Sequence, residues 1–183
     1  QTQTRSIDSI KGENFSVARV KRPFLKQSYL GLVLTDRSTR DGDIDSLSLD
    51  QTLYGADLEL KTSEFLGDKN LQFQSFFVFH SAPMFNNDLI ISDLSTRGLR
   101  ITYPNDIIRT HVSYREFGDM YSPSLGFSRR NGFKRIQPSF SYNPRPQKFD
   151  YIRQIEISIS YENMTDLNGR MLKKQTTLTP FNI

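Results

Sequence analysis

The stretch NLQFQSFFVFH at residues 70–80 alternates in a way that limits what this chain can fold into. Its odd positions are apolar except for one serine, whereas its even positions begin with two glutamines. An amphipathic helix would space apolar residues three and four apart, and a strand buried on both faces would read as a continuous apolar run. The glutamines fit neither pattern, so the stretch predicts a strand with one apolar face. The pattern leaves open whether that face meets a protein core or lipid.

The same period of two recurs along the chain and predicts an all-β protein of about nine strands. The predicted strands are residues 14–20, 28–35, 52–60, 70–79, 94–103, 107–115, 133–142, 151–162 and 169–178. The connections are too short for helical crossovers, so neighbouring strands should pair antiparallel in an up-and-down meander. Residues 14–20 break the alternation, because Phe15 and Val17 lie on one face while Ala18 and Val20 lie on the other.

The alternating positions predict one common apolar face on one continuous sheet, because register ties each row to a single side. The predicted members of this face are Leu30, Leu32, Leu34, Leu58, Leu60, Phe73, Phe77, Phe79, Ile155, Ile157 and Ile159.

The lengths of the connections indicate an outer-membrane β-barrel. Long loops at 36–51, 80–93 and 116–132 alternate with short turns at 21–27, 61–69, 104–106 and 143–150. Alternate connections of a meander lie at the same end, so the long loops should gather at one end, as in outer-membrane barrels. The last connection, NMTDLN, is short where a long loop is expected. A soluble β-sandwich or clam-like sheet is the alternative, although it has no reason to segregate loop lengths.

Composition removes several classes of protein. The chain has 183 residues, no cysteine and a net charge of +4 that is scattered along its length. No apolar run approaches the roughly 20 residues of a membrane helix, and no basic segment indicates nucleic-acid binding. The absence of cysteine excludes disulfides and thiolate metal sites within this chain. We expect residues 1–183 to be a single barrel segment that is incomplete at both ends, because the chain opens and stops without signals that match the sheet.

No constellation of catalytic or metal-binding residues is evident. His80 and His111 lie on different strands without metal-ligand spacing, and Glu116 and Asp119 form an acidic pair of a kind common in loops. The acidic loop 41–45 departs from the EF-hand pattern and is favoured as a solvated loop. We therefore predict no catalytic residue, no metal and no cofactor, and the question of an enzymatic activity stays open.

Three motifs carry a resemblance to a known family. They are FLGDKN at 65–70, YPND at 103–106 and GDMYSPSLGF at 118–127, with Arg129 close behind. With them, residues 14–142 resemble the C-terminal domain of large outer-membrane proteins of Gram-negative bacteria. In that family, a domain of unknown function, interpreted as a β-barrel, follows an N-terminal module similar to carbohydrate-binding domains. No catalytic residues can be carried over from it, and this chain lacks the carbohydrate-binding module.

YPND and FLGDKN are explained by tight turns, with Gly67 and Asp68 forming the second one. The long loop at 118–127 is favoured as a folded structural loop over a binding surface. Candidate ligand-binding residues come from this loop and from the polar side of the strand at 107–115. They are Asp119, Tyr121, Arg129, Arg109 and His111.

The predicted function is that of an outer-membrane segment acting as envelope anchor or conduit. The expected partners are outer-membrane lipid and, through the associated module, polysaccharide, while nucleic acid is not expected. The bacterial outer membrane is the expected location. The alternatives are a soluble β-rich carbohydrate-binding domain and, less favoured, a glycan hydrolase domain.

Overall fold

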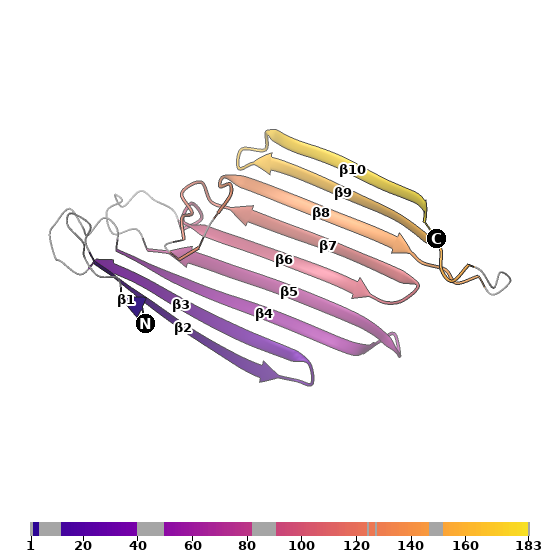
Figure 1. The fold of residues 1–183 in the computed structure, drawn as a ribbon, viewed down its shortest axis with the longest axis horizontal. Helices are drawn as coiled ribbons and strands as arrows, with labels where there is room; N and C mark the ends of the chain where they lie inside the picture. The colour runs from indigo at the N-terminus through magenta and orange to yellow at the C-terminus, as the bar shows by residue number, and fades with distance from the viewer. Residues whose placement is uncertain are drawn as a thin grey trace.

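The computed structural model of the chain is a single antiparallel β-sheet (Figure 1). It describes residues 2–3, 12–39, 50–81, 91–123, 125–126, 128–146 and 152–182. The strands are β1 (Thr2–Gln3), β2 (Glu13–Phe24), β3 (Ser28–Thr39), β4 (Gln51–Phe65), β5 (Lys69–His80), β6 (Ser95–Pro104), β7 (Ile108–Phe117), β8 (Phe133–Tyr142), β9 (Glu156–Asp166) and β10 (Met171–Asn182). None of these described residues forms a helix long and apolar enough to cross a membrane.

The strands follow one another across the sheet in sequence order, so the meander predicted from the sequence is confirmed. Figure 1 shows the tight turns β2–β3, β4–β5 and β6–β7 together at one end of the sheet, which we call the turn end. The strand ends that border 40–50, 81–94 and 118–132 lie at the opposite, loop end. Within the described residues the sheet is open, because β10 pairs only with β9.

Most strands extend beyond their apolar cores, and this corrects several predicted boundaries. The predicted turn at 21–27 shrinks to residues 25–27, because Lys21 to Phe24 continue the ladder against β3. The turn after β4 spans residues 66–68, so Gly67 and Asp68 lie in it as predicted, and its left-handed residues are Leu66 (φ 51°) and Gly67 (φ 99°). Polar strand ends still form backbone hydrogen bonds, which hydrophobic periodicity does not detect.

The register confirms one common apolar face. Leu30 lies opposite Leu58, and Leu60 lies opposite Phe73, which in turn lies opposite Ile101. The row continues through β7 and β8 to Ile157 and Ile159. Ile155 is the exception. β9 begins at Glu156, whereas residue 151 was the predicted start, and the Ile155 amide donates to the carbonyl of Pro144 outside the sheet. In the irregular segment 14–20, Ala18 and Val20 lie on the apolar face.

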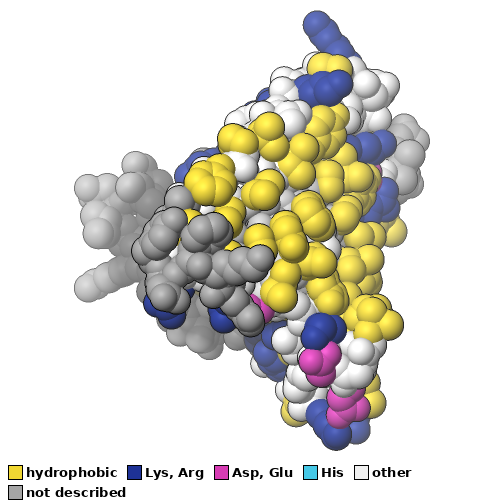
Figure 2. Space-filling view, turned by 90° about the vertical axis from the view of Figure 1, so that its right-hand side faces the viewer, with side chains coloured by type: hydrophobic (Ala, Val, Ile, Leu, Met, Phe, Trp, Pro, Cys, Tyr) yellow, Lys and Arg dark blue, Asp and Glu magenta, His cyan; other side chains and the backbone are white. Residues whose placement is uncertain are grey.

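Nothing in the described structure covers this apolar face. Its side chains are largely open to solvent; for example, Leu32, Ile101 and Phe140 are 54%, 47% and 46% exposed. Figure 2 shows hydrophobic side chains in a broad continuous area with charged side chains around its margins. Among the described residues, the buried hydrophobic side chains are Leu53, Tyr121 and Phe133, and the two that lie in strands belong to the other face. The main apolar surface of the sheet is therefore without cover in the part of the chain that the structure describes.

The opposite, polar face shows close packing at Gly98 of β6. Gly98 lies opposite Phe76, whose ring crosses the space that a side chain at 98 would occupy. A Cβ there would lie 2.7 Å from Phe76 Cε1 and 2.9 Å from the backbone carbonyl oxygen of Tyr114. The ring can rotate, but the carbonyl is fixed in the β6–β7 ladder. A side chain at 98 therefore requires a shift of backbone.

We expect Gly98→Ala to destabilise the sheet by about 1–3 kcal/mol, the usual cost of overpacking. Phe76→Ala in the same background should recover part of this loss, since the carbonyl contact remains. Urea unfolding in detergent micelles of the parent, of each single variant and of the double variant measures the coupling energy between positions 76 and 98. Gly31→Ala is the control, because the atoms nearest to a Cβ at 31 belong to the Asp57 carboxylate, a side-chain end and not backbone. Equal losses at 31 and 98 would contradict the backbone clash.

Candidate functional site

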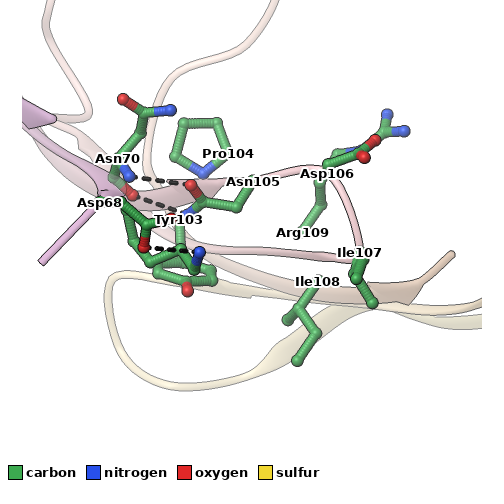
Figure 3. Close-up of a pocket in the computed structure, with 10 residues that line it drawn as sticks. Asp68, Asn70, Tyr103, Pro104, Asn105, Asp106, Ile107, Ile108 and Arg109 are labelled. Carbon is green, nitrogen blue, oxygen red and sulfur yellow. Dashed lines mark hydrogen bonds and ion pairs between the residues drawn. The ribbon is translucent and has the colours of Figure 1, made fainter. Parts of the chain in front are cut away.

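A pocket of about 930 Å³ lies at the turn end (Figure 3). Residues 68–70 form one side of it and residues 103–109 form the other. These segments contain two of the three motifs that stand out in the sequence, FLGDKN and YPND. The sequence predicted that these two turns lie at the same end of the sheet, but it did not predict the contact between them.

The contact between the two motifs is made by one side chain. Asn105 Oδ1 accepts a hydrogen bond from the Asn70 amide at 2.8 Å, and Asn105 Nδ2 donates to the Asn70 carbonyl at 2.9 Å (Figure 3). The amide group thus pairs with the backbone as a neighbouring strand residue would. It ties the β6–β7 turn to the first residues of β5, where the ladder between these strands has ended.

Of the four charged residues that line this pocket, Asp68, Lys69 and Asp106 have ion-pair partners, and Arg109 is the fourth. Lys69 lies 2.7 Å from Asp68, and its ammonium holds the pKa of that carboxyl below its ordinary value. Asp106 pairs with Arg145 at 2.8 Å, with both side chains 59% exposed. Exposed pairs of this kind contribute little binding or stability. The arrangement explains the motifs by turn structure and gives no converging set of unpaired groups.

The loop from β7 to β8 folds back onto the polar face at the loop end. Tyr121 is buried against His80 and Phe117, with ring centroids 5.9 Å apart in both cases. Phe117 stacks on Phe133 at 4.9 Å. Burial raises the pKa of the Tyr121 hydroxyl. Asn131 fixes the loop further by donating from Nδ2 to the Tyr121 carbonyl.

His80 is the centre of this cluster and is 4% exposed. Its Nε2 lies 3.2 Å from the Ser122 amide, which donates to it, and its Nδ1 lies 2.7 Å from Gln51 Nε2. The imidazole therefore links the start of β4 to the loop after β7. In the part of the chain that the structure describes, no group of three or more acids and histidines could hold a metal.

The five residues predicted to bind a ligand do not form one site. Tyr121 is a buried packing residue, and the Asp119 carboxylate lies against Gly132, where a Cβ would come within 1.9 Å of Oδ1. Arg129 is exposed at the loop end. Arg109 and His111 lie on the polar face of β7, as predicted, and His111 Nδ1 is 2.6 Å from the Ser139 hydroxyl.

Two other predictions concern acidic groups. Glu116 does not join Asp119 in a shared site, because it lies on the apolar side of β7 and pairs with Arg97 at 3.0 Å. It also accepts a hydrogen bond from the Tyr114 hydroxyl. The acidic loop 41–45 lies outside the described residues.

The middle of the polar face carries a groove of about 230 Å³ that sequence inspection missed. Asp57 and Glu59 of β4 line one side of it, while Arg100 of β6 and Arg115 of β7 line the other. The neutral side chains of β5, including Gln74, lie between them. These groups are neighbours only because of the register between β4, β5, β6 and β7. The pattern of apolar residues within one strand does not determine that register.

The acids of this groove are held by their neighbours. Asp57 pairs with Arg19 of β2 at 2.9 Å. Glu59 pairs with Lys61 at 2.5 Å and accepts hydrogen bonds from Gln72 and Gln74 at 3.2 and 2.7 Å. Both carboxylates therefore have a cationic partner, and Glu59 has two amide partners as well.

Comparisons of the chain with models of protein families, with curated proteins and with solved structures find no match. What can be said of the function therefore depends on the two faces of the sheet.

We expect Asn105→Ala to destabilise the turn end by about 1–2 kcal/mol, because two hydrogen bonds of about 0.5–1.5 kcal/mol each are lost. Amide exchange at Asn70, measured by NMR, should accelerate about tenfold, while amides in the middle of β5 stay protected. Asp106→Asn is the control, since it removes only an exposed ion pair. Equal acceleration of exchange at Asn70 in both variants would show that the Asn105 side chain does not stabilise the Asn70 backbone specifically.

We expect Tyr121→Ala to release the loop between β7 and β8, which contains Arg129 and Arg130. Loss of a buried aromatic ring costs about 3–5 kcal/mol. Trypsin should then cleave after these arginines much faster than in the parent chain. Tyr121→Phe keeps the ring and its contacts, so its cleavage rate should stay close to that of the parent. Unchanged cleavage in Tyr121→Ala would mean that the ring does not hold the loop.

Proposed function

We propose that this chain is a segment of an outer-membrane β-barrel, with its apolar face toward lipid and its polar face toward the interior. The observation that supports this most directly is the contrast between the two faces. One is a continuous apolar surface without a cover in the described structure, and the other carries Asp57, Glu59 and Arg100 at its centre. Soluble monomers rarely expose so large an apolar area.

The length of the apolar face fits this proposal. On β4 the residues that face the apolar side run from Thr52 to Thr62 without a charge, which is 11 positions along the strand. A tilted strand needs about 9–11 residues to cross the hydrocarbon layer. Charges on this side lie toward the ends of the strands. Arg97, Glu116 and Lys134 are opposite one another toward the loop end, and Arg22 of β2 lies toward the turn end. A charge near the interface costs only about 0–1 kcal/mol, compared with about 2–4 kcal/mol at the centre.

Aromatic side chains border the apolar face at both ends. Tyr54 stacks on Phe79 at 5.2 Å toward the loop end, and Phe65 meets Tyr103 at 6.3 Å toward the turn end. Aromatic rings of this kind favour the membrane interface, where their apolar and polar parts are both satisfied. The distribution of side chains along β4, β5 and β6 therefore supports strands that cross a bilayer.

The resemblance to Gram-negative outer-membrane proteins extends the proposal to a role. The segment would serve as envelope anchor or conduit for an associated carbohydrate-binding module, in the bacterial outer membrane. Closure into a barrel would require a partner for the outer edge of β10, which among the described strands pairs only with β9. The proposal assigns no enzymatic step to the chain.

Single cysteines test which face meets lipid. The chain has no native cysteine, so Ile101→Cys and Thr102→Cys can each carry one nitroxide label. These adjacent residues of β6 lie on opposite faces. In lipid vesicles we expect the label at 101 to collide with dissolved oxygen, which is concentrated in the acyl layer. The label at 102 should collide with a water-soluble nickel chelate.

Other outcomes would overturn the proposal. If both labels collide with the nickel chelate, the apolar face meets water, and insertion has failed. If the label at 101 is shielded from both reagents, protein covers the face instead, as in a soluble binding domain. Label-to-label distances within a sample of Ile101→Cys then show whether that cover is a second copy of this chain.

A further inference from the structure

Three arginines lie side by side on consecutive strands of the polar face. Arg115 of β7 is directly opposite Arg135 of β8, and Arg100 of β6 is opposite Ser113, one diagonal step from Arg115. Directly opposite residues of an antiparallel pair have Cβ atoms about 4.5–5.5 Å apart, and like charges in that arrangement are destabilising. We call these three residues the arginine ladder.

The ladder is not neutralised within the described residues. Its one acidic neighbour is Glu162 of β9, which lies 3.8 Å from Arg135 and only 2.8 Å from Lys173. Glu162 is thus shared between two cations. No hydrogen bond or ion pair joins Arg100 or Arg115 to another described side chain. The four cations and one carboxylate leave a local excess of positive charge.

The nearest other acids are too distant and already occupied. Asp57 and Glu59 lie on β4, two strands from Arg100, which is about 9–10 Å at the usual strand spacing. Asp57 pairs with Arg19, and Glu59 with Lys61. The neutral Gln74 and Phe76 lie between them and the ladder.

Two donors of the ladder are buried without an acceptor. The Nε atoms of Arg100 and Arg135 have no solvent contact and no hydrogen-bond partner. A buried donor left unpaired is destabilising, and more so when the group is charged. Three facing cations and two unpaired donors form an unfavourable arrangement that an anion would relieve.

We propose that the arginine ladder binds a multivalent oxyanion, a phosphate or sulfate group. Guanidinium groups donate in pairs to the oxygens of such anions. Three of them on successive strands supply more donors and charge than a single carboxylate can accept, whereas a tetrahedral dianion has oxygens for all three. The groove beside Arg100 and Arg115 gives the anion access from the polar side. The proposal concerns the polar face alone and holds whether lipid or protein covers the other face.

The test uses the full chain in detergent micelles with ¹⁵N-labelled arginine. Inorganic phosphate and sulfate are titrated at constant ionic strength, with chloride as the balancing ion and acetate as a monovalent carboxylate. We expect saturable shifts of the Nε–H signals of Arg100, Arg115 and Arg135 with phosphate and sulfate. Acetate should give at least tenfold weaker binding.

Substitutions distinguish a specific anion site from non-specific attraction by the net positive charge. Arg115→Gln should weaken phosphate binding about tenfold or more, since one charge-assisted hydrogen bond is worth about 1.5–3 kcal/mol. Arg115→Lys keeps the charge but loses the paired donors, so its affinity should be intermediate. Arg130→Gln removes an exposed cation elsewhere and should bind phosphate as the parent does. Circular dichroism of each variant establishes that the sheet is retained.

Three results would overturn the proposal. Shifts that follow ionic strength, whichever anion is added, would show screening without a site. Equal weakening in Arg115→Gln and Arg130→Gln would show that net charge alone attracts phosphate. Acetate binding as strong as phosphate binding would show that the arginine ladder does not select a multivalent anion.

Discussion

The structure depends on the register between antiparallel strands. Each pairing fixes which side chains share a face, and a shift of one residue would move every apolar side chain of that strand to the polar side. Apart from irregular pairing near the ends of β4 and β10, the register continues from β2 to β10, so Leu60, Phe73 and Ile101 lie directly opposite one another. The two faces, and every site on them, are consequences of this alignment.

Hydrophobic alternation predicted the nine main strands and their order, because side chains on a half-covered sheet follow a period of two. It missed the ends. Lys21 and Arg22 extend β2, and Asn163 to Asp166 extend β9, since backbone pairing does not require apolar side chains. Alternation also could not separate Ile155 from Ile157, although only the second lies in the ladder.

The sites were harder to predict, because they depend on neighbours from other strands. Tyr121 stood out as a ligand residue in a loop, yet its ring is buried against His80. The arginine ladder escaped notice because Arg100, Arg115 and Arg135 are distant in sequence, and each is one charge on an ordinary polar row. Only the register places them together. Asn105 shows the same limit, since the turn was evident but its contact with Asn70 was not.

The free edge of β10 and the uncovered apolar face impose related demands. β10 carries Lys173, Lys174 and Pro180, and its ladder is irregular between Thr179 and Asn182. Lysines and proline are common on edge strands, where they discourage further pairing in water. A sheet packed over the apolar face would bury that face but leave this edge as it is. In lipid an unpaired edge is not tolerated, so closure into a barrel would have to pair it at the same time as the face is buried. The two interpretations of the apolar face therefore differ most at β10. Cover by protein leaves the backbone of this edge unpaired, whereas burial in lipid requires that it be paired.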